Sequence, residues 1–84
     1  MKSFKKTAYF EYIYTNRADR KRIKKEWIIE TIENPEFEEI QKDARIRRWK
    51  YIEEAEKFLS VILLEDGETV HNAFFDRSFK RRKS

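Results

Sequence analysis

The sequence predicts an α+β fold in which helices pack on one face of a mostly antiparallel β-sheet. Three observations support this class. Apolar residues recur at helical spacing in 18–32, the pair Asn34-Pro35 marks the end of that region, and two apolar runs flank the turn-forming pair Asp66-Gly67. In chain order the elements read β-α-α-β-β-β-β, which gives a sheet of four to five strands.

The first element is predicted to be a strand over residues 7–15, TAYFEYIYT. This segment is dense in aromatic and β-favouring residues and contains no turn former before Asn16. Asn16 or Asp19 then caps a helical region. We expect a short basic helix and then a longer one that stops at Asn34-Pro35, because proline disfavours the α conformation in the residue before it.

The next segments predict a short strand over 36–41, a turn at 42–44 and a longer strand over 45–53, RIRRWKYIE. The longer strand should pair with the hairpin that follows. A two- or four-residue turn between them puts Arg47 on the same face as Ser60 and His71, whereas an odd loop with a bulge reverses that assignment.

Residues 57–76, KFLSVILLEDGETVHNAFFD, predict a β-hairpin. Asp66-Gly67 supplies the two positive-φ positions of a type I′ turn. Pairing around this two-residue loop sets Ile62 opposite His71 and places His71 on the same face as Ser60. That face is where function is expected.

Length and composition limit the class of protein. The 84 residues predict one domain over 1–84 that ends in a basic tail at 77–84, and the net charge of +4 suits contact with a polyanion. The absence of cysteine excludes a disulfide or a thiolate metal site. Because no apolar run has membrane-spanning length and no signal peptide is recognisable, we expect a cytoplasmic protein without membrane contact.

Charge is segregated along the chain. Basic residues gather at 17–25, 45–50 and 77–83, and acidic residues gather at 30–43 and 53–68. A surface divided in this way favours two different partners, one anionic and one basic.

Two segments, EWIIETIENPE and DARIRRWKYIEEAEKFLSVILLEDGETVHNAFFDRSFKRR, resemble a family of short bacterial proteins that is grouped with the RelE/ParE toxin superfamily. The resemblance covers Arg17 to Arg82, and its most specific parts are Trp27 with Asn34-Pro35 and the motif LEDGETVHNAFFDR. It implies a RelE/ParE-like fold, with two N-terminal helices packed on a curved antiparallel sheet.

The resemblance also implies partners and activities. A small antitoxin is often encoded beside such a toxin, and superfamily members either cleave messenger RNA on the ribosome or inhibit DNA gyrase, so the fold leaves the chemistry open. This sequence departs from the family at Ala44 and Glu56, where glycine commonly stands. We expect the two replacements to stiffen their loops and to alter the turn type.

RNA cleavage without a metal needs a base for the 2′-hydroxyl, cations for the charged phosphorane and an acid for the leaving oxygen. His71, the one histidine, is the candidate acid or base, and Arg47 is the candidate second catalytic group. Two structural alternatives stay open. His71 could be a half-buried strand residue bonded to a neighbour, and Arg47 could be a strand cation paired with a carboxylate.

Other cations are candidates for contacts with RNA phosphates. The segment 17–25 holds six cations in nine residues, and the basic tail could track a phosphate backbone. The alternatives are surface salt bridges and a solubilising tail. The candidate phosphate-binding residues are Arg20, Arg45, Arg48, Arg77, Lys80 and Arg81.

The leading hypothesis is a toxin-like endoribonuclease of a toxin–antitoxin pair that acts on RNA or the ribosome without a metal or cofactor and is able to form a homodimer. The alternative is a non-enzymatic module on the same fold that binds protein or nucleic acid. Cleavage predicts that His71 and the arginines converge in an open site. The binding module predicts a buried His71 and arginines paired with carboxylates.

Overall fold

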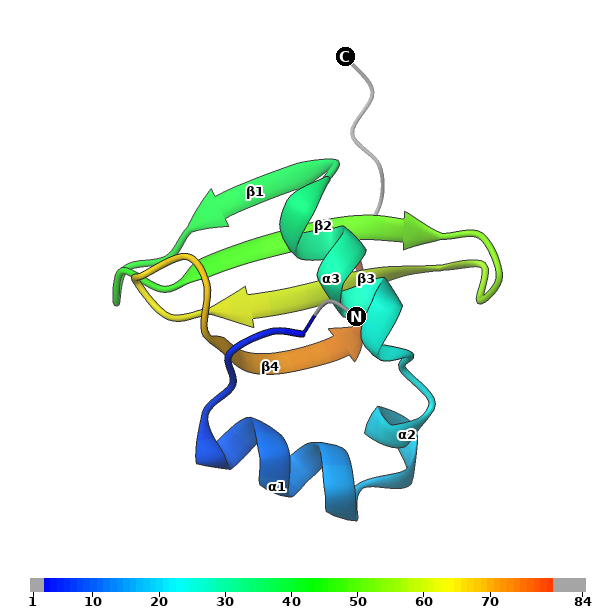
Figure 1. Ribbon diagram of the computed structural model, residues 1–84. Coiled ribbons are helices and arrows are strands. Elements are labelled where there is room, and N and C mark those ends of the chain that lie inside the picture. The colour runs from blue at the N-terminus through cyan, green and yellow to red at the C-terminus, as the bar shows by residue number, and fades with distance from the viewer. Residues whose placement is uncertain (1–2, 80–84) are drawn as a thin grey trace.

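The structure is a computed structural model that describes residues 3–79. Its helices come first and its strands follow (Figure 1). The elements are α1 Ala8–Asn16, α2 Ala18–Lys21, α3 Lys25–Glu33, β1 Phe37–Ile40, β2 Ile46–Ile52, β3 Lys57–Leu63 and β4 Val70–Phe75.

The strands form one antiparallel sheet in the order β1-β2-β3-β4. Helix α3 lies across β2 and β3, while α1 and α2 lie beside β4 (Figure 1). The predicted α+β class is therefore confirmed, with three helices in the described chain instead of two.

The core lies between the helices and the central strand. Leu59, Val61 and Leu63 alternate along β3 and are fully buried. They belong to one cluster with Phe10 of α1 and Ile28 of α3. Since burial of one such side chain contributes about 1.5–3 kcal/mol, this cluster holds the helices on the sheet.

The predicted strand over 7–15 is wrong, because this segment forms α1. The hydroxyl oxygen of Thr7 caps the helix and accepts a hydrogen bond from Phe10 N at 3.1 Å. Phe10 and Ile13, one helical turn apart, are both buried. Among residues 3–7, before α1, strand pairing is limited to one parallel bridge from Lys6 to Val70 of β4.

The short basic helix and the longer helix are confirmed as α2 and α3. Helix α3 ends at Glu33, directly before Asn34-Pro35, as predicted. The predicted caps are wrong, since Asn16 belongs to α1 and Asp19 lies inside α2. Arg17 stands at the cap position of α2 and makes no side-chain capping bond.

The strands predicted in 36–41 and 45–53 are confirmed as β1 and β2. Because Ile52 pairs with Lys57, the loop between β2 and β3 has four residues, Glu53 to Glu56. A four-residue loop was predicted to place Arg47 on the same face of the sheet as Ser60. The observed pairing of β2 with β3 confirms this placement.

The hairpin is confirmed, but its turn is not type I′. That turn needs positive φ at both Asp66 and Gly67, and only Gly67, with φ of 71°, meets the condition. Gly67 N donates to Leu64 O at 2.9 Å, and the Asp66 carboxylate accepts bonds from Thr69 N at 2.9 Å and Thr69 Oγ1 at 2.6 Å. These bonds, with the Thr69 hydroxyl foremost, lower the pKa of Asp66 to about 2.

A register shift in β4 corrects the predicted pairing of the hairpin. Ile62 pairs with Asn72 and not with His71, so His71 is the extra residue of a β-bulge. Beyond the bulge every residue of β4 changes face relative to the prediction. Phe74 consequently pairs with Ser60 and joins its face of the sheet.

Ala44 and Glu56 have φ of 69° and 54°, in the left-handed region that glycine adopts without steric cost. We predict that Ala44→Gly and Glu56→Gly each raise the free energy of unfolding by about 1 kcal/mol, because the Cβ clash with the backbone is removed. Urea denaturation of the purified variants measures this change.

Ala55→Gly is the matched control, since Ala55 lies in the same loop without positive φ. It should lower the free energy of unfolding by about 0.5–1 kcal/mol, because glycine gains freedom in the unfolded chain. Destabilisation by Glu56→Gly as large as that of Ala55→Gly would contradict the strain argument.

Phe79, within the predicted basic tail at 77–84, packs against aromatic rings of the sheet. Lys80 and Arg81, two candidate phosphate-binding residues, lie outside the described residues. In the described part of the chain, no helix has both the length and the apolar character needed to cross a membrane.

Candidate nucleic-acid interface

Arg47, the predicted catalytic arginine, is held by neighbours on the face of the sheet that carries Ser60, opposite the face on which α1 and α3 pack. Its Nε donates to Ser60 Oγ at 2.7 Å and its Nη2 donates to Asp76 Oδ2 at 2.6 Å. The guanidinium carbon lies 4.7 Å from the ring centre of Trp49 and 5.2 Å from that of Phe74. Arg47 therefore already has a carboxylate and two aromatic partners.

Asp76, the partner of Arg47, also fixes the turn that follows β4. Its Oδ2 accepts a bond from Trp49 Nε1 at 3.1 Å, and its Oδ1 accepts bonds from Ser78 Oγ at 2.8 Å and Phe79 N at 3.2 Å. Burial raises the pKa of Asp76, but the bonds from Ser78 and Trp49 and the charge of Arg47 lower it by more. The ionised carboxylate thus joins β2 to the chain beyond β4.

Aromatic rings cover this face of the sheet. Phe79 stacks on Trp49 with ring centres 4.6 Å apart, and it meets Phe37 and Phe58 edge to face at 5.1 and 5.0 Å. Trp49 is 5% exposed, and Tyr51 contacts the edge of Phe58. These aromatic rings pack against one another and leave Trp49 buried.

His71, at the bulge in β4, contacts the start of α1. Its Nδ1 lies 3.2 Å from Thr7 Oγ1, and its ring stacks on Tyr9 with centres 5.0 Å apart. Burial, followed by the charge of Arg45, lowers the pKa of His71, which favours the neutral imidazole. In the neutral tautomer whose Nδ1 carries no hydrogen, His71 accepts a hydrogen bond from the Thr7 hydroxyl, and this contact joins β4 to the start of α1.

Two more candidates, Arg45 and Arg48, have carboxylate partners. Arg48 donates from Nε to Glu38 Oε2 at 2.6 Å and from Nη1 to Ile32 O at 2.8 Å, at the end of α3. Arg45 Nε lies 3.6 Å from Asp43 Oδ2 and stays 42% exposed. Arg48 therefore joins the helix to the sheet, whereas Arg45 remains accessible near His71.

The two predicted catalytic residues have separate sets of partners. In the described residues, His71 contacts Thr7 and Tyr9, whereas Arg47 contacts Ser60, Asp76 and aromatic rings. His71 and Arg47 therefore do not converge in one site; His71 is partly buried, and Arg47 is paired with the carboxylate of Asp76.

Cations without a carboxylate partner gather instead around α2. Within residues 3–79, no carboxylate oxygen lies within 4.0 Å of their charged nitrogens. We refer to this cluster as the α2 basic surface. Its members are Lys21, Arg22, Lys25, Lys57 and Arg77.

Sequence reasoning identified most of this surface as the basic segment 17–25 and Arg77, but it missed Lys57. Lys57 stands alone in the sequence between Glu56 and Phe58. It reaches the cluster only because β3 begins beside the end of β4. Lys57 could have been assigned to this surface from the predicted hairpin, because the hairpin pairing places the start of β3 beside the end of β4.

Part of the α2 basic surface lines a recess of about 290 Å³, which we call the α2–β4 recess. Its cations come from three separate segments of the chain, namely α2, the start of β3 and the residues after β4. Its aromatic wall comes from the end of β4. The lining residues are Asp19, Arg20, Arg22, Lys57, Phe74, Phe75 and Arg77.

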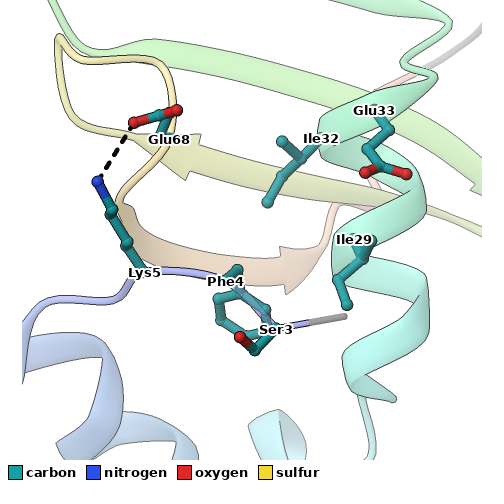
Figure 2. A pocket seen from close by; sticks show the side chains of 7 residues that line it. All are labelled: Ser3, Phe4, Lys5, Ile29, Ile32, Glu33 and Glu68. Carbon is teal, nitrogen blue, oxygen red and sulfur yellow. Dashed lines mark hydrogen bonds and ion pairs between the residues drawn. The ribbon is translucent and has the colours of Figure 1, made fainter. Parts of the chain in front are cut away.

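A second recess lies between the N-terminal segment and α3 (Figure 2). Phe4, Ile29 and Ile32 give it apolar walls, and Lys5 at its edge is paired with Glu68 at 3.5 Å. Its charged lining residues are one lysine, Lys5, and two glutamates, Glu33 and Glu68. It therefore lacks the excess of cations that marks the α2–β4 recess.

Among residues 3–79, no group of three or more His, Asp or Glu side chains is arranged to hold a metal ion. No protein-family model, no curated protein and no solved structure matches the chain.

Proposed function

We propose that the protein binds RNA through the α2 basic surface as a non-enzymatic module. The observation that carries the proposal is the gathering of Lys21, Arg22, Lys25, Lys57 and Arg77 without carboxylate partners in the described chain. Unpaired cations of this kind contact phosphates and release counterions, which gives sequence-independent affinity. Elsewhere the candidate arginines Arg47 and Arg48 are already paired.

The resemblance to the RelE/ParE superfamily supports RNA or the ribosome as the target. We extend the proposal to a RelE/ParE-like fold and to a toxin-like role beside a small antitoxin, for which the α+β layer of helices on an antiparallel sheet is the expected framework. An antitoxin that masks the RNA-binding surface would have to present carboxylates to α2.

The test is the affinity for a labelled single-stranded RNA, measured by fluorescence anisotropy over a range of salt concentrations. We predict that the triple variant Lys21→Gln, Arg22→Gln, Lys25→Gln loses affinity about tenfold or more at low salt. The slope of log affinity against log salt should fall by about 2, since each contact to a single strand contributes about 0.7.

The matched control is Lys5→Gln, Lys42→Gln, Lys50→Gln, which changes the net charge equally. Lys5 and Lys50 already face Glu68 and Glu30, and Lys42 belongs to the turn between β1 and β2, a turn at the far end of the sheet from α2 (Figure 1). Its affinity should stay within about twofold of the parent protein. Equal losses in the two triple variants would mean that only net charge matters and would refute a defined surface.

A second candidate function is metal-independent RNA cleavage at His71. The observation in its favour is a lowered pKa that keeps the imidazole neutral beside exposed Arg45, as a general base requires. The same RNA, incubated with and without ribosomes, reports on it. Cleavage that disappears in His71→Ala and weakens in Arg45→Gln would favour this candidate over simple binding.

A further inference from the structure

The α2–β4 recess holds more positive charge than its own carboxylate balances. Four cations line it, and Asp19, which is its only lining carboxylate among residues 3–79, is already paired with Arg17 and Arg20. Burial raises the pKa of Asp19, but the charges of Arg20 and Arg17 lower it by more, so the carboxylate is ionised and engaged. The other lining cations, Arg22, Lys57 and Arg77, have no carboxylate within 4.0 Å in the described chain.

Arg20 is the most firmly held of these cations. It pairs with Asp19, its guanidinium carbon lies 5.5 Å from the ring centre of Phe74, and its side chain is 16% exposed. Its Nε is buried and has no hydrogen-bond partner among the described residues. An unsatisfied donor of this kind costs about 1–3 kcal/mol, so a shift of the Arg20 side chain that lets this buried Nε donate to a ligand oxygen would be favoured.

The aromatic wall of the recess already holds cations. Arg20 and Arg47 lie over Phe74, and the ammonium of Lys57 lies 5.5 Å from the ring centre of Phe75. Trp27 contacts Phe75 from another side, at 6.0 Å. The two rings therefore position cations and are not available to stack on a base, so the recess selects charge rather than base identity.

We infer that the α2–β4 recess binds the phosphomonoester end of an RNA, its 5′- or 3′-terminal phosphate; this inference rests on the RNA binding proposed above. A terminal phosphate carries about −1.5 to −2 charge near pH 7 and offers three oxygens, whereas an internal phosphodiester carries a single charge. A recess of about 290 Å³ accommodates this compact group, and cations from three segments surround it. The remaining members of the α2 basic surface would then contact the adjoining backbone.

The test compares one short oligouridylate in three forms, with a 5′-phosphate, with a 3′-phosphate and with hydroxyls at both ends. Fluorescence anisotropy with an internal label should show about tenfold tighter binding of one phosphorylated form, as expected for charge-assisted bonds to a terminal phosphate. Millimolar inorganic phosphate at constant ionic strength should abolish this difference in affinity between the phosphorylated RNA and the hydroxyl-ended RNA. The preferred form identifies the end that is bound.

Arg77→Gln and Lys57→Gln should each reduce the preference for the phosphorylated RNA over the hydroxyl-ended RNA to about twofold or less. Lys25→Gln, outside the recess, should lower the affinity for all three RNAs equally and leave that preference unchanged. Thermal melting verifies that the variants are folded. Equal affinity for the three forms would overturn the inference and leave the proposed RNA binding intact. Absence of binding to every form would overturn both.

Discussion

Asp76→Ala should destabilise the protein by about 2–4 kcal/mol, because it leaves Arg47 with its charge unpaired and frees the turn after β4. The side chains of Asp76 and Arg47 are 10% and 22% exposed, so water replaces the lost bonds poorly. Phe79, whose amide bonds to the same carboxylate, should lose its position on Trp49. Urea denaturation followed by tryptophan fluorescence measures both effects.

The control is Glu38→Ala, which removes the partner of Arg48 at a more exposed position. Glu38 is 45% exposed, and an ion pair of this kind contributes about 1 kcal/mol or less. A double variant that also carries Arg47→Met should recover part of the loss in Asp76→Ala, since no charge is left unpaired. Equal destabilisation by Glu38→Ala and Asp76→Ala would contradict the central role of Asp76.

The same residue gives the protein an acid dependence of known sign. The pKa of Asp76 is lowered in the folded state, so its contribution is present above its ordinary pKa near 3.8 and is lost as pH falls through the lowered folded value. Asp76→Asn should therefore reduce the change in stability between neutral pH and strongly acidic pH. Denaturation midpoints measured across that range report the difference.

Phe10→Ala should be the most damaging substitution in α1, at about 3–5 kcal/mol, because its ring is 1% exposed and its loss leaves a cavity between the helix and β4. Tyr12→Ala, at a residue 66% exposed, should change the free energy of unfolding by about 0.5 kcal/mol or less. Chemical denaturation of the two variants tests the contrast.

This pair of variants separates a helix from a strand. Residues two apart share one face in a strand, so a strand over 7–15 would give Phe10→Ala and Tyr12→Ala comparable effects. In a helix they point in nearly opposite directions. Similar losses in the two variants would contradict the presence of α1.

The fold was predictable from sequence wherever local chemistry and burial agree. Helix α3 ends before Pro35 because proline disfavours the α conformation in the residue that precedes it. The two apolar runs that flank Gly67 predict a hairpin. The strand predicted over residues 7–15 was wrong. Aromatic residues favour a strand in isolation, whereas in this fold the Thr7 cap and the burial of Phe10 and Ile13 stabilise a helix.

The site was less predictable, because partners distant in sequence decide what each cation does. Arg47 meets Asp76 and Arg48 meets Glu38 only after the strands pair, and nothing in the local sequence separates these arginines from the unpaired Arg22. The bulge at His71 arises inside an otherwise regular alternation. A single inserted residue moved the histidine away from its expected pairing.

Strand β1 has a consequence for self-association. It forms one margin of the sheet, and it carries the exposed carboxylates Glu38 and Glu39 next to Ile40, which is 71% exposed. If two copies joined their sheets antiparallel along this margin, glutamates of one copy would face those of the other, and like charges across such a seam repel. The charge of Glu39, and of Glu38 where its pairing with Arg48 opens, therefore disfavours the growth of a continuous sheet past the exposed Ile40.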